Sequence, residues 1–328
     1  MDGFFALALD NLGSPLILAF VLGVGASLAR SELTFPEAAA KALSIYLLFA
    51  IGMKGGVSVA EHGVDSTLLA TILAGLVLSA GLPLVAFRLL QVMTRLDRTN
   101  AAVVAAHYGS ISIVTFVAGT SVLQSSGIEA EGFMVAVAAA MEAPAILSAL
   151  WLLSRGGEGE EPRRMDAELW REILLNGSIV LLVGAFVIGL MTGTDGLTEI
   201  EGLMVAPFKG ALCLFLLDMG LIAGRGLRDS RALITPGLLG FGFLMPILGS
   251  LAGALAGTMI GLSTGGLMLL MVLSASASYI AVPAAMRVAV PEANPSIYLT
   301  LSLAITFPFN LTIGLPLYLA IARTLTGG

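Results

Sequence analysis

The chain has 328 residues, of which 57% are hydrophobic and only 12% are charged. Soluble domains carry about 25% charged residues, so this composition excludes an ordinary soluble protein and indicates an integral membrane protein. The formal charge of −6 is divided between the two sides of that membrane and says little about partners. The single cysteine, Cys213, excludes an intramolecular disulfide and a cysteine-rich metal site.

Ten apolar stretches are long enough for spanning helices, which need about 20 mostly apolar residues each. We expect the first to be a retained span and not a cleaved signal, because Met1-Asp2-Gly3-Phe4 has no basic residue. The hydrophilic segment 154–170 follows the fifth stretch and is predicted to be a linker. In chain order the stretches are 13–30, 37–54, 66–91, 100–124, 131–153, 171–192, 204–223, 231–259, 265–289 and 294–323.

The basic residues predict how these spans are oriented, because cytoplasmic loops carry an excess of Lys and Arg. Of the 16 basic residues, 13 fall on one side, and Lys54, Lys209 and Arg323 fall on the other. The first side is therefore predicted to be cytoplasmic, with the linker inside and both termini outside. The 13 are Arg30, Lys41, Arg88, Arg95, Arg98, Arg155, Arg163, Arg164, Arg171, Arg225, Arg228, Arg231 and Arg287.

The second half of the chain repeats the first. Residues 52–56 align with 220–224, residues 110–112 with 276–278, and Pro144 with Pro308, at offsets of 168, 166 and 164. We therefore predict two repeats of five spans each, residues 1–153 and 171–328. An odd number of spans inverts the second repeat, which is the plan of many secondary transporters, with the site at midplane where the repeats meet.

The fourth and ninth spans contain matching interruptions at 107–115 and 274–283. Each places small hydroxyl residues in the membrane, and a Gly or Pro weakens the helical hydrogen bonding there. A half-helix that begins at such a break directs free N–H groups and a positive dipole end at midplane. Facing breaks would bind a small anion, although hydroxyl pairs also join membrane helices without touching a substrate. The predicted anion ligands are Gly109, Ser110, Ser112, Ser276 and Ser278.

Two carboxylates fall at membrane depth, away from the ends of the predicted spans: Glu142 beside Pro144 in the fifth and Asp218 in the seventh. An intramembrane carboxylate costs at least about 2.5–3.5 kcal/mol, so each is a functional candidate. A hard cation such as sodium prefers carboxylate, hydroxyl and carbonyl oxygens. The alternatives are a packing hydrogen bond for Glu142 and pairing with a Lys for Asp218. The predicted cation ligands are Glu142, Thr115, Thr306 and Asn310.

The remaining polar groups suggest no other chemistry. Lys54 and Lys209 are interpreted as interfacial anchors, and His107 as a packed, hydrogen-bonding residue that could instead titrate during transport. The sequence shows no nucleophile–base pair, metal motif, phosphate loop or basic aromatic patch. We therefore predict neither an enzyme nor a nucleic-acid-binding protein, and no cofactor apart from a coupling ion.

Several motifs resemble those of the sodium-dependent bicarbonate transporters first associated with cyanobacterial carbon concentration. The most specific are 286–296, Met-Arg-Val-Ala-Val-Pro-Glu-Ala-Asn-Pro-Ser, and 314–318, Gly-Leu-Pro-Leu-Tyr. Further matches are Gly109 with Ser112 and Thr115, residues 143–145, and the pair 219–220. The resemblance extends along essentially the whole chain.

The resemblance implies a gate part of spans 1, 2, 6 and 7 and a core part of spans 3–5 and 8–10. It also implies a homotrimer in a bacterial inner membrane and sodium-coupled uptake of bicarbonate. Members can be regulated on the cytoplasmic side by a small trimeric protein of the PII type. The chain departs from the cyanobacterial pattern at Tyr279, which is acidic there, and at Ile113 and Val114, which are small there.

Two alternatives stay open beside sodium-coupled symport of bicarbonate or a similar monoanion, and the departure at Tyr279 motivates the first. One is a proton-coupled or uncoupled carrier of a small organic acid, which would follow a pH gradient without sodium. The other is a non-transporting membrane sensor or scaffold, against which the short linker argues.

Overall fold

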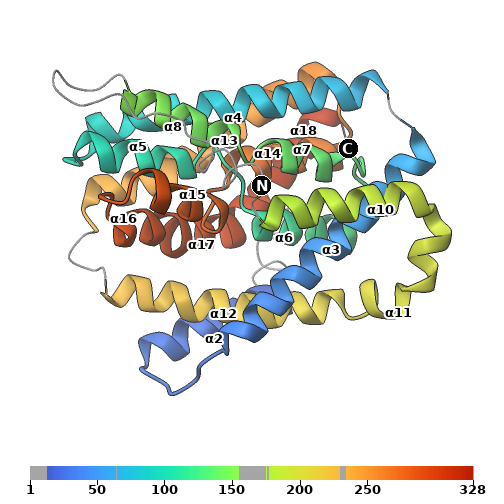
Figure 1. The fold of residues 1–328 in the computed structure, drawn as a ribbon, viewed down its shortest axis with the longest axis horizontal. Coiled ribbons are helices and arrows are strands. Elements are labelled where there is room, and N and C mark those ends of the chain that lie inside the picture. The colour runs from blue at the N-terminus through green and yellow to red at the C-terminus, as the bar shows by residue number, and fades with distance from the viewer. Residues whose placement is uncertain (1–12, 64, 155–174, 176, 230–233, 328) are drawn as a thin grey trace.

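A computed structural model describes residues 13–63, 65–154, 175, 177–229 and 234–327, and these ranges contain helices and no strand (Figure 1). Within them, seven helices are long and apolar enough to cross a membrane. Three shorter apolar helices, Pro15–Leu28, Ile113–Ser125 and Thr264–Ala275, overlap the predicted spans 1, 4 and 9. Most of the predicted linker 154–170 and the beginning of the predicted sixth span lie outside the described residues.

The first half of the chain forms α2 (Pro15–Leu28), α3 (Glu37–His62), α4 (Ser66–Met93), α5 (Arg98–His107), α6 (Ile113–Ser125), α7 (Met134–Ala140) and α8 (Pro144–Ser154). The second half forms α10 (Gly177–Glu199), α11 (Glu201–Met204), α12 (Phe208–Asp229), α13 (Pro236–Ile260), α14 (Thr264–Ala275), α15 (Ala281–Ala289) and α16 (Pro295–Leu299). The last span continues through π-helical η1 (Thr300–Thr306), α17 (Phe307–Phe309), π-helical η2 (Asn310–Gly314) and α18 (Leu315–Thr326).

Local capping explains where several of these helices begin. Asp65, Asp97, Thr235 and Ser263 each accept a hydrogen bond from a backbone N–H in the first turn of α4, α5, α13 and α14. Such caps satisfy N–H groups that have no partner within the helix. Partial burial raises the pKa of Asp97, but hydrogen bonds from Asn100 outweigh it, and the net pKa lies below its usual value.

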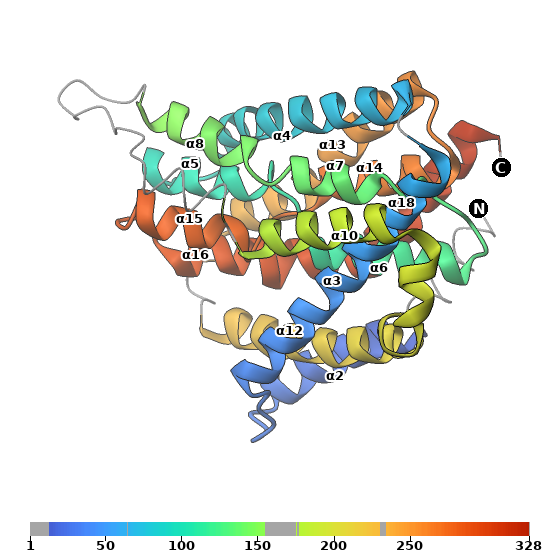
Figure 2. The ribbon, with the colours of Figure 1, turned by 45° about the vertical axis from the view of Figure 1, so that its right-hand side comes forward.

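Two helix pairs rest on close backbone contacts through glycine. α2 packs along α12 at the lower edge of both views, and α3 packs along α10 (Figures 1 and 2). A Cβ on Gly23 or Gly220 would overlap the facing backbone at the α2–α12 crossing, and one on Gly56 would overlap Phe186 of α10. Small residues let membrane helices approach in this way. Above the α2–α12 pair in Figure 1, α4, α13 and α14 pack on one another.

The end of the second span differs from the prediction. We expected it to end at Lys54, but α3 continues to His62. Lys54 is half-buried, and its ammonium lies 5.0 Å from the ring centroid of Phe208. The helix continues because the glycines after Lys54 pack against α10 and the α7 region.

Two interruptions were not predicted. The fifth span is broken at residues 141–143, between α7 and α8. The tenth is π-helical on both sides of Pro308. π-helical turns are rare and are frequent at functional sites. The aligned prolines, Pro144 and Pro308, were the sequence signal for both.

Candidate functional site

The two predicted breaks meet each other. Residues 108–112 join α5 to α6, and residues 276–280 join α14 to α15; we call their meeting point the crossing. The Ser278 N–H donates to the His107 carbonyl at 2.8 Å, and the His107 ring donates from Nδ1 to the Ser278 carbonyl at 2.5 Å. The Ser112 N–H donates to Ser276 Oγ at 2.9 Å. Hydrogen bonds from both halves of the chain therefore fix the crossing.

A buried carboxylate lies beside the crossing. Glu142 occupies the unpredicted break between α7 and α8, with only 6% of its surface exposed. Ser110 Oγ donates to its Oε2 at 3.1 Å. Burial of an ionised carboxylate is costly unless a charge or several donors compensate it. One neutral hydroxyl is weak compensation, so this position favours a bound cation or a proton.

A pocket joins the crossing to Glu142, and we call it the central pocket. Both ends of the crossing contribute the start of a helix, because Ser112 and Ile113 open α6 while Ile280 and Ala281 open α15. Two positive helix ends therefore face one space. The lining residues are Ile111, Ser112, Ile113, Glu142, Ser278, Tyr279, Ile280 and Ala281.

Two serine hydroxyls of the central pocket accept hydrogen bonds from the protein and keep a proton that can be donated to a ligand. Ser112 Oγ accepts from Thr115 N–H at 3.3 Å and from Thr115 Oγ1 at 2.9 Å, so its own proton is free for a ligand. Ser278 Oγ accepts from Val282 N–H at 3.4 Å and likewise retains a proton. Thr115, a predicted cation ligand, thus lies one hydrogen bond from the pocket.

Three predicted anion ligands lie around the central pocket and do not line it. Ser110 contacts Glu142, and Ser276 donates to the Leu273 carbonyl while accepting from Ser112. Gly109 packs against α4, where a Cβ would overlap Pro83. Close packing therefore explains why this position is glycine. In this structure these residues shape the crossing and orient its side chains.

The predicted cation ligands Thr306 and Asn310 make other contacts. Thr306 Oγ1 donates to the Gly242 carbonyl at 2.8 Å, so Tyr108 must be the donor in its 2.7 Å bond to Thr306. Asn310 Nδ2 donates to the Ala275 carbonyl at 3.0 Å, and its Oδ1 accepts from Tyr318. These bonds tie the π-helical stretches to α13 and to the end of α14. A role in cation binding stays a prediction for both.

His107 is a packed, hydrogen-bonded residue, as interpreted from the sequence: it is buried, bonds to Ser278 and stacks on Tyr298 with centroids 4.7 Å apart. Sequence reasoning missed one residue of the central pocket. Tyr279 was noted only as a departure from a pattern, yet it lines the central pocket. Its position directly after Ser278 was the available signal. Asp218 is buried in α12 and does not line the central pocket.

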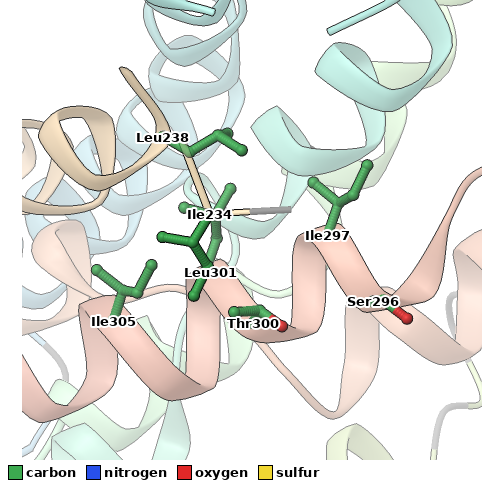
Figure 3. A pocket seen from close by; sticks show the side chains of 7 residues that line it. All are labelled: Ile234, Leu238, Ser296, Ile297, Thr300, Leu301 and Ile305. Carbon is green, nitrogen blue, oxygen red and sulfur yellow. The ribbon is translucent and has the colours of Figure 1, made fainter. Parts of the chain in front are cut away.

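A second pocket lies between the chain entering α13 and the helix that runs from α16 into η1 (Figure 3). Its lining is mostly aliphatic, carries no charge and includes none of the predicted ligands. The lining residues are Ile234, Leu238, Ser296, Ile297, Thr300, Leu301 and Ile305. The central pocket is the better candidate for a substrate site, because it has a carboxylate and hydroxyl donors.

In the part of the chain that the structure describes, the fold and the site are those of a multi-pass helical membrane protein whose interrupted helices cross at a polar pocket. The family model for the Na+-dependent bicarbonate transporter superfamily matches residues 15–323. The chain therefore belongs to this superfamily of sodium-dependent bicarbonate transporters. Comparison with curated proteins gives no match.

Proposed function

We propose that this protein is a secondary active transporter that carries bicarbonate, or a similar small monoanion, together with sodium. The central pocket is the observation that carries the proposal. It combines two helix N-termini and free hydroxyl donors with one buried carboxylate, in a chain of the bicarbonate transporter superfamily. Donors suit the anion and the carboxylate suits the cation.

The anion would bind at the crossing. Ser112 and Ser278 would donate their hydroxyl protons, and the first N–H groups of α6 and α15 would add donors of fixed direction. Ser110, Ser276 and Gly109 would hold these donors in place through the contacts described above. Fixed donors in a small pocket favour an oxyanion with a single charge, because a dianion needs more compensation for its lost hydration.

The cation would bind at Glu142, with Thr115 nearby and Thr306 and Asn310 as further predicted ligands. Within the described residues, no group of three His, Cys, Asp or Glu could hold a metal ion. The ion would therefore need neutral hydroxyl and carbonyl oxygens beside one carboxylate. Such oxygens are ligands of hard cations.

Charge explains how the two substrates would be coupled. An anion about 4 Å from the Glu142 carboxylate is repelled by about 4 kcal/mol at an effective dielectric constant of 20. A sodium ion that contacts both adds two attractions, which outweigh this repulsion. Each substrate would therefore bind more tightly when the other is present.

Transport would proceed by alternating access, in which the core part moves against the gate part. The packing of α2 on α12 and α3 on α10 supports a separate gate made of predicted spans 1, 2, 6 and 7. The inverted repeat is supported by paired contacts. Gly52 and Gly56 pack against α10, and their partners in the alignment, Gly220 and Gly224, pack against α2.

Contacts at the ends of the broken helices give the proposed repeat further support. The caps Asp97 and Ser263 differ by 166 residues, the offset of the serine motifs. Glu131 accepts from the N–H and hydroxyl of Ser263 at 2.8 Å each, and Asn100 accepts from Asn294 N–H at 2.8 Å. Each repeat thus makes hydrogen bonds to a broken helix of the other.

The proposal also includes ten spans, both termini outside, a bacterial inner membrane, a homotrimer and a PII-like regulator.

Uptake of radiolabelled bicarbonate into proteoliposomes tests the proposal, with and without an inward sodium gradient at fixed pH. We expect uptake that requires sodium and falls in Ser112→Ala. Ser148→Ala is the matched control, because Ser148 donates to the Ala80 carbonyl and does not line the central pocket. Uptake that ignores sodium and follows a pH gradient would instead favour the proton-coupled carrier.

A further inference from the structure

We infer that the Tyr279 hydroxyl is an additional donor to the transported anion and that it sets the affinity for bicarbonate. This inference rests on the proposed function and adds a specificity-determining residue to the central pocket. Tyr279 lies in the break between α14 and α15, directly after Ser278, and both residues line the pocket.

The Tyr279 hydroxyl is buried without a partner. The residue is 9% exposed, and its oxygen lies near the Ser112 side chain but closes no hydrogen bond with any described residue. Burial of a phenol O–H away from water, with no other hydrogen-bond partner, destabilises the protein. A ligand that accepts this hydrogen bond removes the penalty. The free O–H therefore points to an acceptor that binds in the pocket.

Packing holds the ring in one place. Tyr279 meets Phe307 edge to face, with centroids 5.4 Å apart and planes at 69°. A fixed ring presents its donor at little entropic cost, which is the advantage of preorganised binding groups. A phenol O–H donates to an acceptor, and the sodium ion proposed at Glu142 accepts no hydrogen bond, so the phenol serves the anion.

Three hydroxyl-bearing residues line the central pocket, and each can donate a proton to a ligand there. Ser112 and Ser278 each accept hydrogen bonds and retain a proton to donate, and Tyr279 supplies the third. Bicarbonate is a planar anion with three oxygens. Three donors from one side and two helix N-termini give it more complementary contacts than a spherical anion such as chloride could use.

The test is Tyr279→Phe, which removes the O–H and keeps the ring against Phe307. In proteoliposomes we expect the KM for bicarbonate to rise about 10- to 150-fold, the range for a lost hydrogen bond to a charged group. The sodium concentration for half-maximal uptake at saturating bicarbonate should stay unchanged. Tyr46→Phe is the matched control, because its hydroxyl donates to the Leu203 carbonyl and does not line the pocket.

Three results separate this inference from the proposed function. If the wild type transports bicarbonate and Tyr279→Phe has the same KM for it, the inference is overturned and the proposed function stands. The same holds if the variant changes only the sodium dependence. If the wild type shows no uptake, the proposed function fails. The bicarbonate-induced rise in Tm of detergent-purified protein then decides the inference: a smaller rise in the variant supports it, and an equal or absent rise overturns it.

A second variant guards against a folding defect in Tyr279→Phe. Tyr279→His keeps a ring and an N–H donor, so its KM should lie between those of the wild type and Tyr279→Phe. A KM for Tyr279→His above that of a folded Tyr279→Phe would contradict the donor role. Loss of folding in both variants is detected by gel filtration and by Tm. In that case the bicarbonate analogue nitrate, which cannot donate a proton, must still compete with bicarbonate in the wild type, and its failure to do so overturns the inference.

Discussion

Replacement of Glu142 by Gln is the most informative perturbation of the proposed cation site. Gln has nearly the same shape and keeps an oxygen that can accept from Ser110, which lies 3.1 Å from Oε2 in the wild type. The substitution therefore removes the charge and little else. Any change in sodium dependence can then be attributed to the lost carboxylate.

The expected magnitude follows from burial and charge. Attraction between a carboxylate and sodium at about 2.4 Å is about 7 kcal/mol at an effective dielectric constant of 20. Dehydration of the two ions offsets most of it. A net loss of about 1.5–3 kcal/mol, typical of interactions with charged groups, raises the half-saturating sodium concentration about 10- to 150-fold.

The assay is initial bicarbonate uptake across a sodium titration, with Tm and gel filtration to establish folding. Glu199→Gln is the matched control, because Glu199 is exposed at the end of α10. The reasoning is refuted if folded Glu142→Gln keeps the sodium dependence and the maximal rate of the wild type.

Three further substitutions test the packing and the crossing. Gly56→Ala should lower stability by about 1–3 kcal/mol through overpacking against α10, seen as a lower Tm, whereas Gly184→Ala, which meets open space, should not. Ser112→Ala removes the α6 cap and should cost about 1 kcal/mol in thermal unfolding, and an unchanged Tm would contradict that role. His107→Phe keeps the stack on Tyr298 but loses the bond to Ser278, so the maximal uptake rate should fall while the half-saturating sodium concentration stays constant.

The sequence predicted the two interrupted spans because their signals are local. Small hydroxyl residues with Gly109 or Pro283 weaken helical hydrogen bonding within a few residues, and both breaks occur at the predicted places. The apolar lengths also gave the starts of α3 and α4 at Glu37 and Ser66. Each of these features depends on residues that are neighbours in the chain.

The features that were missed depend on contacts between distant segments. The continuation of α3 past Lys54 places Gly55 and Gly56 against other helices, and hydropathy does not report such packing. The contacts of Thr306 and Asn310 go to α13, α14 and α18, which no spacing rule relates to them. The hydrogen bond from His107 to the Ser278 carbonyl joins residues 171 positions apart. Only the alignment of the two repeats, which paired the two breaks, related residues so far apart in the chain.

Accessibility of the central pocket tests the account most directly. Ile280 lines the pocket and is 37% exposed, and Cys213 is the only cysteine, so Ile280→Cys on a Cys213→Ser background gives a single reactive thiol. The measurement is its rate of labelling by a membrane-impermeant maleimide. The account predicts slower labelling when bicarbonate and sodium are present together, and little change with either alone. A labelling rate that is the same under all four conditions would contradict a shared site at the crossing.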